Sequence, residues 1–437
     1  MATATNVGKE QVLDAVYKKV VVRLVPFVFL CYIFAYFSRV NVNFAKLEML
    51  GQLGLSETAY GLGAGIFFLG YVVFAVPSNI MLSKIGARVW IAILMISWGI
   101  FSTCLMFTKT PTEFYIFRFL TGVAEAGFFP GMTYYFTQWF PGERRGRVMA
   151  LFMAAIPLSG VFGGPISGWI LTTFNMGQLG LAGWEWLFLL YGIPTILIGV
   201  SVFWFMPSSY KTASFLSEDE KKMIEAELEV ENRKKDEGCD NNSVLGFLKS
   251  PWVWYFCFVY FLIEMGEYAI GFWMPSIIEN SGMDNLSYVG WLSAIPYFVA
   301  GVVMILVGRS ADLHNERRWH LIVPMLVGMV GLILAAHFSN SIVVAMIGLS
   351  LATAGVLTAL PMFWTVPQAL LGTAAAAGGL ALINSIGNLA GFVSPYFIGW
   401  IKDTTGSTDV ALYVIAACVL FSAILIFRLP KSRFSTT

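Results

Sequence analysis

The sequence predicts an all-α membrane protein with twelve transmembrane helices, and three observations support this fold class. Hydrophobic residues make up 57% of the 437 residues and charged residues only 12%, whereas a soluble domain carries about 25% charged residues. Apolar runs of about 20 residues, long enough to cross a bilayer as a helix, recur along the chain. Lysine and arginine gather in alternate loops between these runs.

The expected spans form two sets of six on either side of a long polar segment. The first apolar run begins near Val20 and is too long for the core of a cleavable signal peptide, so it is interpreted as a span. Glycine is frequent, with 42 residues, as is typical of helices packed closely in lipid. We expect spans at 20–44, 58–82, 88–107, 113–137, 147–173, 184–206, 251–273, 287–308, 319–338, 341–366, 373–401 and 408–428.

The polar segment 207–250 divides the chain into an N-terminal half, 1–206, and a C-terminal half, 251–437. Ser217 is followed three residues later by Glu220, the spacing of a capping box. The stretch up to Lys235 is rich in glutamate and lysine. We therefore expect a short cytoplasmic surface helix within a linker.

Basic residues set the predicted orientation, because cytoplasmic loops hold more lysine and arginine than loops on the other side. With both termini inside, the cytoplasmic side collects nearly all of the basic residues outside the spans. Lys46, Lys109 and Lys402 fall on the other side. The sequence thus predicts a multi-pass protein of the inner (plasma) membrane with both termini cytoplasmic.

The two halves carry similar motifs at corresponding places. Residues 165–170 (PISGWI) lie in the fifth span and residues 395–401 (PYFIGWI) in the eleventh. Basic loops follow the second and the eighth spans, at 83–88 and 308–318. Parallel repeats of this kind are typical of transporters whose substrate binds near the bilayer midplane between the halves.

Several other functions find no support in the sequence. The chain has no arrangement of nucleophile and base that predicts an enzyme and no glycine-rich ATP-binding loop. Its five cysteines and three histidines lack the spacing of metal ligands, and we expect no metal, cofactor or disulfide. A net charge of +1 gives no reason to expect a nucleic-acid partner.

Six plus six spans with basic loops after the second and eighth resemble the major facilitator superfamily. The loop at 308–318 is similar to the motif of that superfamily, and the loop at 83–88 is a degenerate copy. The resemblance implies a twelve-helix fold and a gating role for the charged residues of both loops, which are Lys84, Arg88, Asp312, Arg317 and Arg318.

Three segments resemble the organic anion:proton symporters within that superfamily, which form the anion:cation symporter family. They are residues 37–41 (FSRVN), residues 118–131 (RFLTGVAEAGFFPG) and residues 363–367 (FWTVP), the last followed by Asn384 and Asn388. The carriers of tartrate, rhamnonate and hydroxyphenylacetate look most similar. The resemblance covers nearly the whole chain and implies a small organic anion as substrate and the proton as coupling ion.

Five charged residues fall deep within expected spans, where each costs at least about 2.5–3.5 kcal/mol on insertion scales. The first is Arg39, whose guanidinium can hold a carboxylate through two parallel hydrogen bonds. The resemblance implies that Arg39 binds the substrate carboxylate. The alternative is an arginine that extends to the outer headgroups.

Arg118 and Glu125 are seven residues apart, so they lie on one face of a helix, roughly 10 Å apart along its axis. That separation excludes a direct ion pair along the helix, and we expect Glu125 to be buried without a close partner and to carry a proton. The resemblance implies that Glu125 is a protonation site and that Arg118 contributes to coupling or binding. The alternative is a structural polar network.

The resembled family has an aspartate immediately before the first-span arginine, and this chain has Ser38, which cannot titrate. Glu264 and Glu267 are separated by three residues and share a helix face. Our hypothesis is that one of them, preferably Glu267, supplies the missing protonatable group. The alternative is that both are hydrated near the outer end of the span.

Five further side chains are candidates for the wall of a substrate cavity, because hydroxyl, indole and amide groups suit a hydroxylated ligand. The alternative for the aromatic members is ordinary packing. The candidates are Tyr71, Tyr268, Trp364, Asn384 and Asn388.

These features predict a secondary active importer of a small organic anion, such as a sugar acid, a tartrate-like hydroxy acid or a related carboxylate. It is expected to act as a monomer in the bilayer, by proton symport with alternating access. One alternative is a proton-linked drug or metabolite exporter, since residues 160–168 (GVFGGPISG) resemble an exporter motif whose last glycine is replaced by Trp169. A second alternative is a transporter-like nutrient sensor.

Overall fold

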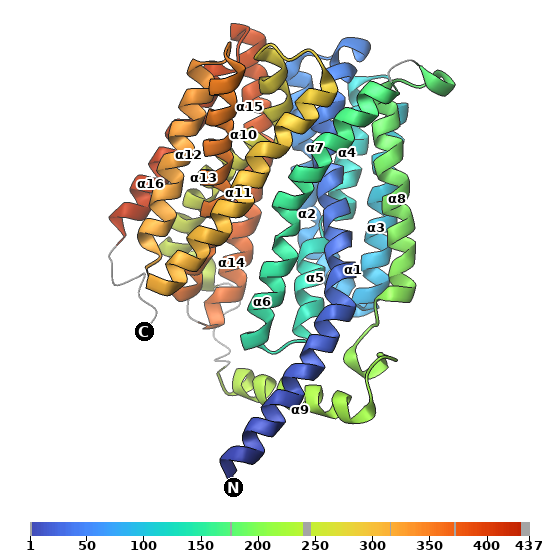
Figure 1. The fold of residues 1–437 in the computed structure, drawn as a ribbon, viewed down its shortest axis with the longest axis vertical. Helices are drawn as coiled ribbons and strands as arrows, with labels where there is room; N and C mark the ends of the chain where they lie inside the picture. Colours follow the sequence, from blue (N-terminus) through green and yellow to red (C-terminus); the bar gives the residue numbers. More distant parts are fainter. Residues whose placement is uncertain (1, 175–176, 239–245, 315, 371–372, 430–437) are drawn as a thin grey trace.

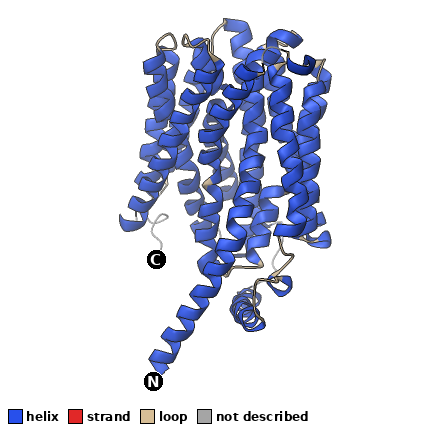
Figure 2. Ribbon diagram, turned by 45° about the vertical axis from the view of Figure 1, so that its right-hand side comes forward, coloured by secondary structure: helices blue, strands red, loops and turns tan. Residues whose placement is uncertain are grey.

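The computed structural model describes residues 2–174, 177–238, 246–314, 316–370 and 373–429. Within these residues the secondary structure is helical throughout, and the helices are joined by short loops (Figure 2). Most of the helices run side by side along the long axis of the molecule (Figure 1). The all-α fold class predicted from the sequence is therefore confirmed.

The expected spans correspond to α-helices or pairs of α-helices, with four short 3₁₀ turns between them. The α-helices are α1 (Ala2–Leu53), α2 (Glu57–Ile85), α3 (Ala87–Cys104), α4 (Pro111–Glu125), α5 (Phe128–Thr137), α6 (Gly142–Met153), α7 (Ala155–Thr173), α8 (Gly183–Phe205), α9 (Glu218–Gly238), α10 (Pro251–Asn280), α11 (Leu286–His314), α12 (Arg318–His337), α13 (Ile342–Leu370), α14 (Thr373–Asn388), α15 (Ala390–Thr405) and α16 (Asp409–Arg428).

Among the described residues, eleven helical segments are long and apolar enough to cross a membrane, judged by length and composition. The remaining expected span, 113–137, is divided into α4 and α5 at Ala126 and Gly127, and each part is shorter than 18 residues. Gly127 is required there, because a Cβ atom would lie 1.8 Å from the Ser78 hydroxyl oxygen of α2. The break directly follows Glu125, so it places that carboxyl at a helix end inside the bundle.

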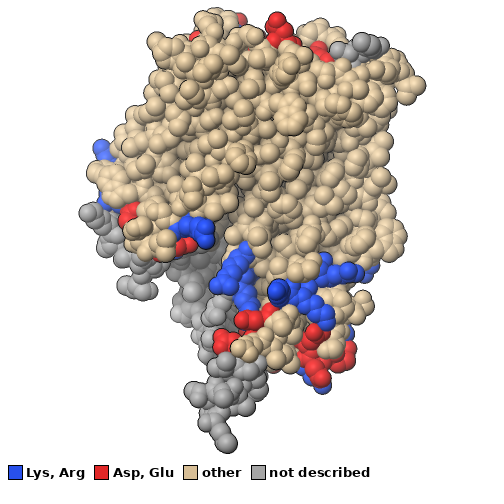
Figure 3. Space-filling view, in the orientation of Figure 1, with Lys and Arg blue, Asp and Glu red and all other residues tan. Residues whose placement is uncertain are grey.

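The two ends of the bundle differ in charge. One end, called the α9 end here, holds α9 and the projecting start of α1 (Figure 1). Lysine and arginine side chains gather near this end in Figure 3, whereas the band above it is almost free of charge on the face shown. The other end, called the opposite end, holds the loops that follow α1, α3, α10 and α15. An uncharged band between two polar ends is what a bilayer requires.

Helices before and after α9 meet chiefly through α2 against α15 and α7 against α11. Glycines allow these close contacts: a Cβ on Gly164 would lie 2.6 Å from the carbonyl oxygen of Gly290, and one on Gly61 would lie 2.3 Å from that of Pro395. Gly61 and Gly290 follow the starts of α2 and α11, so the contacts lie toward the opposite end. The two sets of helices are therefore packed tightly at that end.

The helix α9 begins at the capping box of Ser217. The Glu220 carboxylate accepts a hydrogen bond of 2.7 Å from the Ser217 N–H, and the Glu220 N–H donates one of 3.3 Å to the serine hydroxyl. Lys19 of α1 reaches Glu220 at 2.9 Å. These contacts hold the start of α9 against the end of α1 that projects from the bundle.

Candidate functional site

A cavity lies between the helices that precede α9 and those that follow it. The wall is formed by residues of α1, α2, α7, α10, α11 and α13, and it is largely apolar with a few polar groups. The lining residues are Tyr36, Arg39, Val40, Asn43, Phe68, Ile156, Gly160, Glu267, Tyr268, Ile270, Gly271, Phe272, Tyr297, Thr353, Val356 and Leu357. A largely apolar concave site with few polar groups is typical of small-molecule binding.

Arg39 of α1 is paired with Glu125 of α4 beside this cavity. The guanidinium Nε and Nη2 lie 2.7 Å and 2.6 Å from the same carboxylate oxygen, Oε1. The side chain of Glu125 is 2% exposed and that of Arg39 17% exposed. The expectation that Glu125 lacks a close partner is therefore wrong, because its partner comes from another helix 86 residues earlier.

Aromatic rings surround the Arg39 guanidinium. The rings of Tyr36, Phe67 and Tyr71 have their centroids 5.2, 5.5 and 5.4 Å from its central carbon. Such cation–π contacts stabilise a cation that has left water. Arg39 is thus held inside the protein and does not extend to the headgroups. Tyr71, a candidate for the cavity wall, lies beside Arg39 but is not among the residues that line the cavity.

Arg118 of α4 is fully buried and contacts backbone instead of the cavity. Its Nε and Nη2 donate to the carbonyl oxygens of Gly63 and Ala64 on α2, at 3.4 and 3.2 Å. Its guanidinium also lies 4.8 Å from the centroid of the Phe67 ring. These contacts tie α4 to α2, and Arg118 is not among the residues that line the cavity. This geometry is that of a structural polar network between helices, which was the alternative to a role of Arg118 in coupling or binding.

Glu264 and Glu267 form a pair of carboxyl groups on α10. Glu264 is 3% exposed, and Glu267 follows it by one helical turn on the same helix. Glu267 is half-buried and lines the same cavity as Arg39. The alternative in which both carboxyls are hydrated at the outer end of the span does not hold for Glu264.

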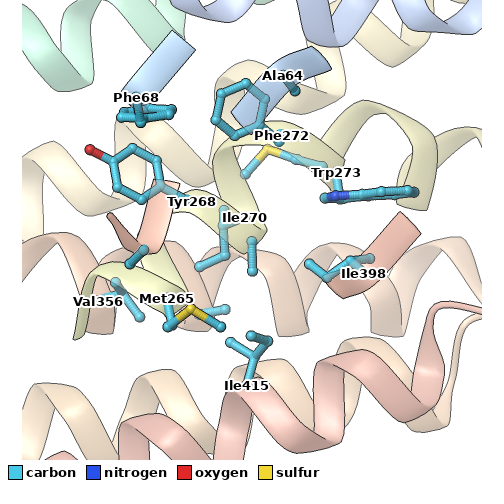
Figure 4. Packing of buried hydrophobic residues seen from close by; sticks show 14 of the residues in the cluster. Ala64, Phe68, Met265, Tyr268, Ile270, Phe272, Trp273, Val356, Ile398 and Ile415 are labelled. Carbon is cyan, nitrogen blue, oxygen red and sulfur yellow. The ribbon is translucent and has the colours of Figure 1, made fainter. Parts of the chain in front are cut away.

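The remaining polar candidates are connected to α10. The Tyr268 hydroxyl donates to the Asn388 amide oxygen at 2.9 Å, and the Asn388 amide donates to the Asn384 carbonyl at 2.8 Å. Trp364 packs edge-on against Tyr260, with ring centroids 4.8 Å apart. Of these residues Tyr268 lines the cavity; its ring lies beside that of Phe68 (Figure 4), with centroids 4.5 Å apart.

The charged loop residues lie at the α9 end, away from the cavity. Lys84 is exposed in the last turn of α2, next to Gly86, which has a φ of +91°. Arg317 approaches Asp312 at 3.9 Å. Arg318 starts α12, where it lies over the Phe427 ring of α16 and donates to the Phe427 carbonyl oxygen. The half-buried Arg88 lies in the first turn of α3.

A second ionic cluster, which the sequence did not predict, lies at the opposite end. Lys46 is 3% exposed; its ammonium group lies 2.8 Å from Glu57 and 3.0 Å from the Ser276 hydroxyl. Glu57 also contacts Lys402 at 2.5 Å, and Asp403 accepts hydrogen bonds from the Glu57 and Thr58 N–H groups. The sequence feature that could have indicated this cluster is the position of Lys46, two helical turns beyond Arg39 on the same face of α1. We call Lys46, Glu57, Ser276, Lys402 and Asp403 the opposite-end cluster.

Comparison with known proteins identifies the family. The family described as Major Facilitator Superfamily matches residues 28–395. The chain belongs to this superfamily. It is a multi-pass membrane protein and a secondary transporter of a metabolite, not an enzyme.

Relatives with similar sequences extend over nearly the whole chain. A Pseudomonas putida protein described as "Putative metabolite transport protein NicT" is 44% identical and covers 98% of both chains. A "Putative tartrate transporter" of Agrobacterium vitis is 45% identical over 95% of this chain and 92% of its own. A "Quinolone resistance transporter" of Acinetobacter baumannii is 36% identical over 94% of each chain. The predicted likeness to tartrate-type carriers is therefore confirmed.

The fold is shared with solved transporter structures. The crystal structure of a D-xylose–proton symporter superposes with a TM-score of 0.72 at 16% sequence identity and covers 94% of this chain and 99% of its own. This likeness shows the fold alone.

Proposed function

We propose that the protein is a proton-coupled importer of a small organic anion whose carboxylate binds to Arg39. The candidate substrates are sugar acids, tartrate-like hydroxy acids and related carboxylates. The observation that carries the proposal is the pair of Arg39 and Glu125: a guanidinium beside a cavity between two sets of helices already holds a carboxylate. The name of the relative from Agrobacterium vitis supports the same class of substrate.

Glu125 and the substrate compete for Arg39 in this mechanism. While Glu125 is ionised it neutralises the guanidinium, and an incoming carboxylate meets a site without net positive charge. A proton on Glu125 removes that competition, so Arg39 becomes a free cation in an environment of low dielectric. Proton and anion therefore bind together, which is the requirement for symport.

Alternating access then follows from movement of the halves 1–206 and 251–437 around the cavity. The opposite-end cluster holds the halves together at one end, since Lys46 and Glu57 come from the first half and Ser276 and Lys402 from the second. With the basic α9 end in the cytoplasm of a cell whose inner membrane holds the protein, this arrangement is closed to the outside. We propose that the monomer is the working unit and that the charged loops at 83–88 and 308–318 control the cytoplasmic end.

The proposal is tested by the ligand binding of purified protein. Thermal-shift measurements with galactonate, tartrate and 4-hydroxyphenylacetate should show stabilisation by at least one of them, since a ligand of the folded state raises the melting temperature. Arg39→Gln should lose the stabilisation, whereas Arg147→Gln, an exposed arginine at the start of α6, should keep it. Carboxylate binding of unchanged affinity in Arg39→Gln would contradict the proposal.

An exporter is the second candidate function, favoured by the relative described as a quinolone resistance transporter. Gly160, Gly164 and Gly168 of this motif lie on the α7 face that packs on α11: a Cβ on Gly160 would lie 2.2 Å from the Tyr297 ring. Membrane vesicles of known orientation separate the two functions, because an importer accumulates substrate in right-side-out vesicles. Proton-driven uptake by liposomes that contain only this protein would also exclude a sensor without transport.

A further inference from the structure

The carboxyl pair of Glu264 and Glu267 has no part in the mechanism above. Glu264 lies behind the cavity wall at 3% exposure, and one of its oxygens, Oε2, is buried without a hydrogen-bond partner. Glu267 is half-buried and lines the cavity with Arg39. An ionisable pair at membrane depth is costly and marks a site of function by default.

A carboxylate buried at membrane depth without a cation beside it is costly, so such a carboxyl holds a proton instead of ionising. Glu264 is buried on α10 and forms no salt bridge with a described residue, whereas Glu267, one turn farther along the same helix, lines the cavity. The pair therefore holds one proton and one negative charge, and it can accept a second proton. Protons can reach it from the cavity through Glu267.

The other titratable groups around the pair leave its charge uncompensated. Arg39 of α1 faces it, but Glu125 neutralises Arg39. The remaining neighbours are tyrosines, which are neutral near pH 7; they are Tyr32 and Tyr36 of α1, Tyr260 and Tyr268 of α10 and Tyr297 of α11. With Glu125 ionised, the cavity thus has a net charge of −1.

We propose that Glu264 and Glu267 form a second proton-binding site, which makes the protein a symporter of one monocarboxylate with two protons. The inference rests on the proposed function, since it takes Arg39 as the carboxylate site and Glu125 as the first proton site. One carboxylate, one proton on Glu125 and one on the pair bring the cavity from −1 to neutrality. The loaded carrier can then close without a buried net charge.

The same charges select among carboxylates. Arg39 is the cation of the cavity lining, while Arg118 is held by backbone carbonyls and Lys46 by Glu57. A dicarboxylate bound to Arg39 would bring its second negative charge into a cavity that also holds Glu267, and two protons would leave a net charge of −1. Within the proposed class, the substrate is therefore a monocarboxylate such as an aldonic or aromatic acid, and tartrate is a poor substrate.

The pair also explains how proton coupling survives without an acid at Ser38. The Ser38 hydroxyl donates to the Phe34 carbonyl of its own helix at 3.2 Å and does not ionise near neutral pH. The acid lies instead on α10, in the other half of the chain, and acts across the cavity. Protonation of the α10 pair changes the charge of the C-terminal half, and protonation of Glu125 changes the charge of the N-terminal half.

The test is the ratio of protons to substrate in proteoliposomes that contain the full chain. Galactonate and 4-hydroxyphenylacetate serve as monocarboxylate probes and tartrate as the dicarboxylate probe, and the ratio is obtained from the pH gradient that just stops net flux against a known substrate gradient at zero membrane potential. The wild type should move two protons with each monocarboxylate. Glu267→Gln and Glu264→Gln should move one, whereas Glu229→Gln, an exposed carboxylate of α9, should still move two.

A second measurement covers variants that fold poorly. Infrared difference spectra of the wild type on binding of the monocarboxylate should show two newly protonated carboxyl groups, and the spectrum of Glu267→Gln one. A ratio of one proton in the wild type, an unchanged ratio in both α10 variants, or tartrate uptake as fast as that of both monocarboxylates overturns the inference while leaving Arg39 and Glu125 in place. Absence of proton-driven uptake of any carboxylate overturns the proposed function itself.

Discussion

The cavity and the opposite-end cluster each hold a cation of α1, and the two cations have different partners. Arg39 pairs with Glu125 inside one half of the chain, and its guanidinium also lines a cavity. Lys46 pairs with Glu57 in the same half, and residues of the other half complete that cluster. In the proposed mechanism a ligand acts on the first pair inside one half, whereas the contacts of the cluster between the halves break when the halves separate.

The two cations are also connected. Seven residues separate Arg39 from Lys46, so they lie on one face of α1, roughly 10 Å apart. The helix is continuous over this stretch, and a shift of α1 on ligand binding reaches both places. Under the proposed function, the cavity binds the substrate and the proton, the opposite end closes the carrier, and α1 connects the two regions.

The largest effect is expected from Glu125→Gln, which removes the proton site but keeps the shape of the side chain. Glutamine leaves the charge of Arg39 without compensation, so the affinity for the anion should depend less steeply on pH, through the Glu264 and Glu267 pair alone. Proton-driven uptake should fall roughly 100-fold, near the upper end of typical coupling between sites, while exchange of labelled for unlabelled substrate continues. Parallel uptake and exchange assays in proteoliposomes check this result. Proton-driven uptake at the wild-type rate would show that Glu125 does not couple.

A smaller effect is expected from Gly164→Ala at the packed opposite end. The new Cβ would lie 2.6 Å from the Gly290 carbonyl oxygen, and overpacking of this kind costs about 1–3 kcal/mol. Uptake should fall about tenfold, and the distance between spin labels at positions 109 and 284, on exposed loops of the two halves, should increase. Gly51→Ala is the matched control, because its Cβ would meet no atom within 4 Å. An unchanged label distance in Gly164→Ala would contradict the assignment of closure to this end.

Lys402→Gln tests the ionic part of the same end. Lys402 approaches Glu57 at 2.5 Å and is 19% exposed, and its loss leaves Glu57 with Lys46 as its partner. Because Lys46 still contacts Ser276 and Asp403 still accepts from the Glu57 and Thr58 N–H groups, the opening of this end should increase only about fivefold, the lower end of coupling effects. The distance between the same two spin labels measures this opening, and the affinity for the carboxylate should stay within about twofold of that of the wild type. A larger loss of affinity than of closure would mean that the two regions are not separate.

Sequence reasoning predicted the positions of the helices well, because hydropathy and length are local properties. It also identified Arg39, Glu264, Glu267 and Tyr268 as residues of the bundle interior, since charged and polar groups in apolar runs are conspicuous. The break between α4 and α5 was not predicted: it depends on the approach of Ser78 to Gly127, which is a tertiary contact.

The sequence alone could not predict which groups the buried charged residues bind. Glu125 was judged by its neighbours on its own helix, but its partner is Arg39 of α1. Lys46 and Lys402 were counted as loop cations because they stand near span ends, whereas both are bound to Glu57 in the opposite-end cluster. Arg118 was a candidate for substrate binding, and the Gly63 and Ala64 carbonyls that hold it in place carry no signal in the sequence.

The smallest effect is expected where α9 meets α1, outside both regions. The hydrogen bond from Lys19 holds the pKa of the Glu220 carboxyl below its usual range, and the Ser217 N–H acts in the same direction. A carboxyl whose pKa is depressed by folding stabilises the folded state at neutral pH, and this stabilisation is lost as the pH falls through its folded pKa. Because the pair is exposed, the contribution is at most about 1 kcal/mol. Glu220→Gln should therefore lower the melting temperature slightly at pH 7 and not below pH 4, while uptake stays within about twofold of the wild type. A large loss of transport in this variant would assign α9 a part in gating, and closure would then no longer be confined to the opposite end.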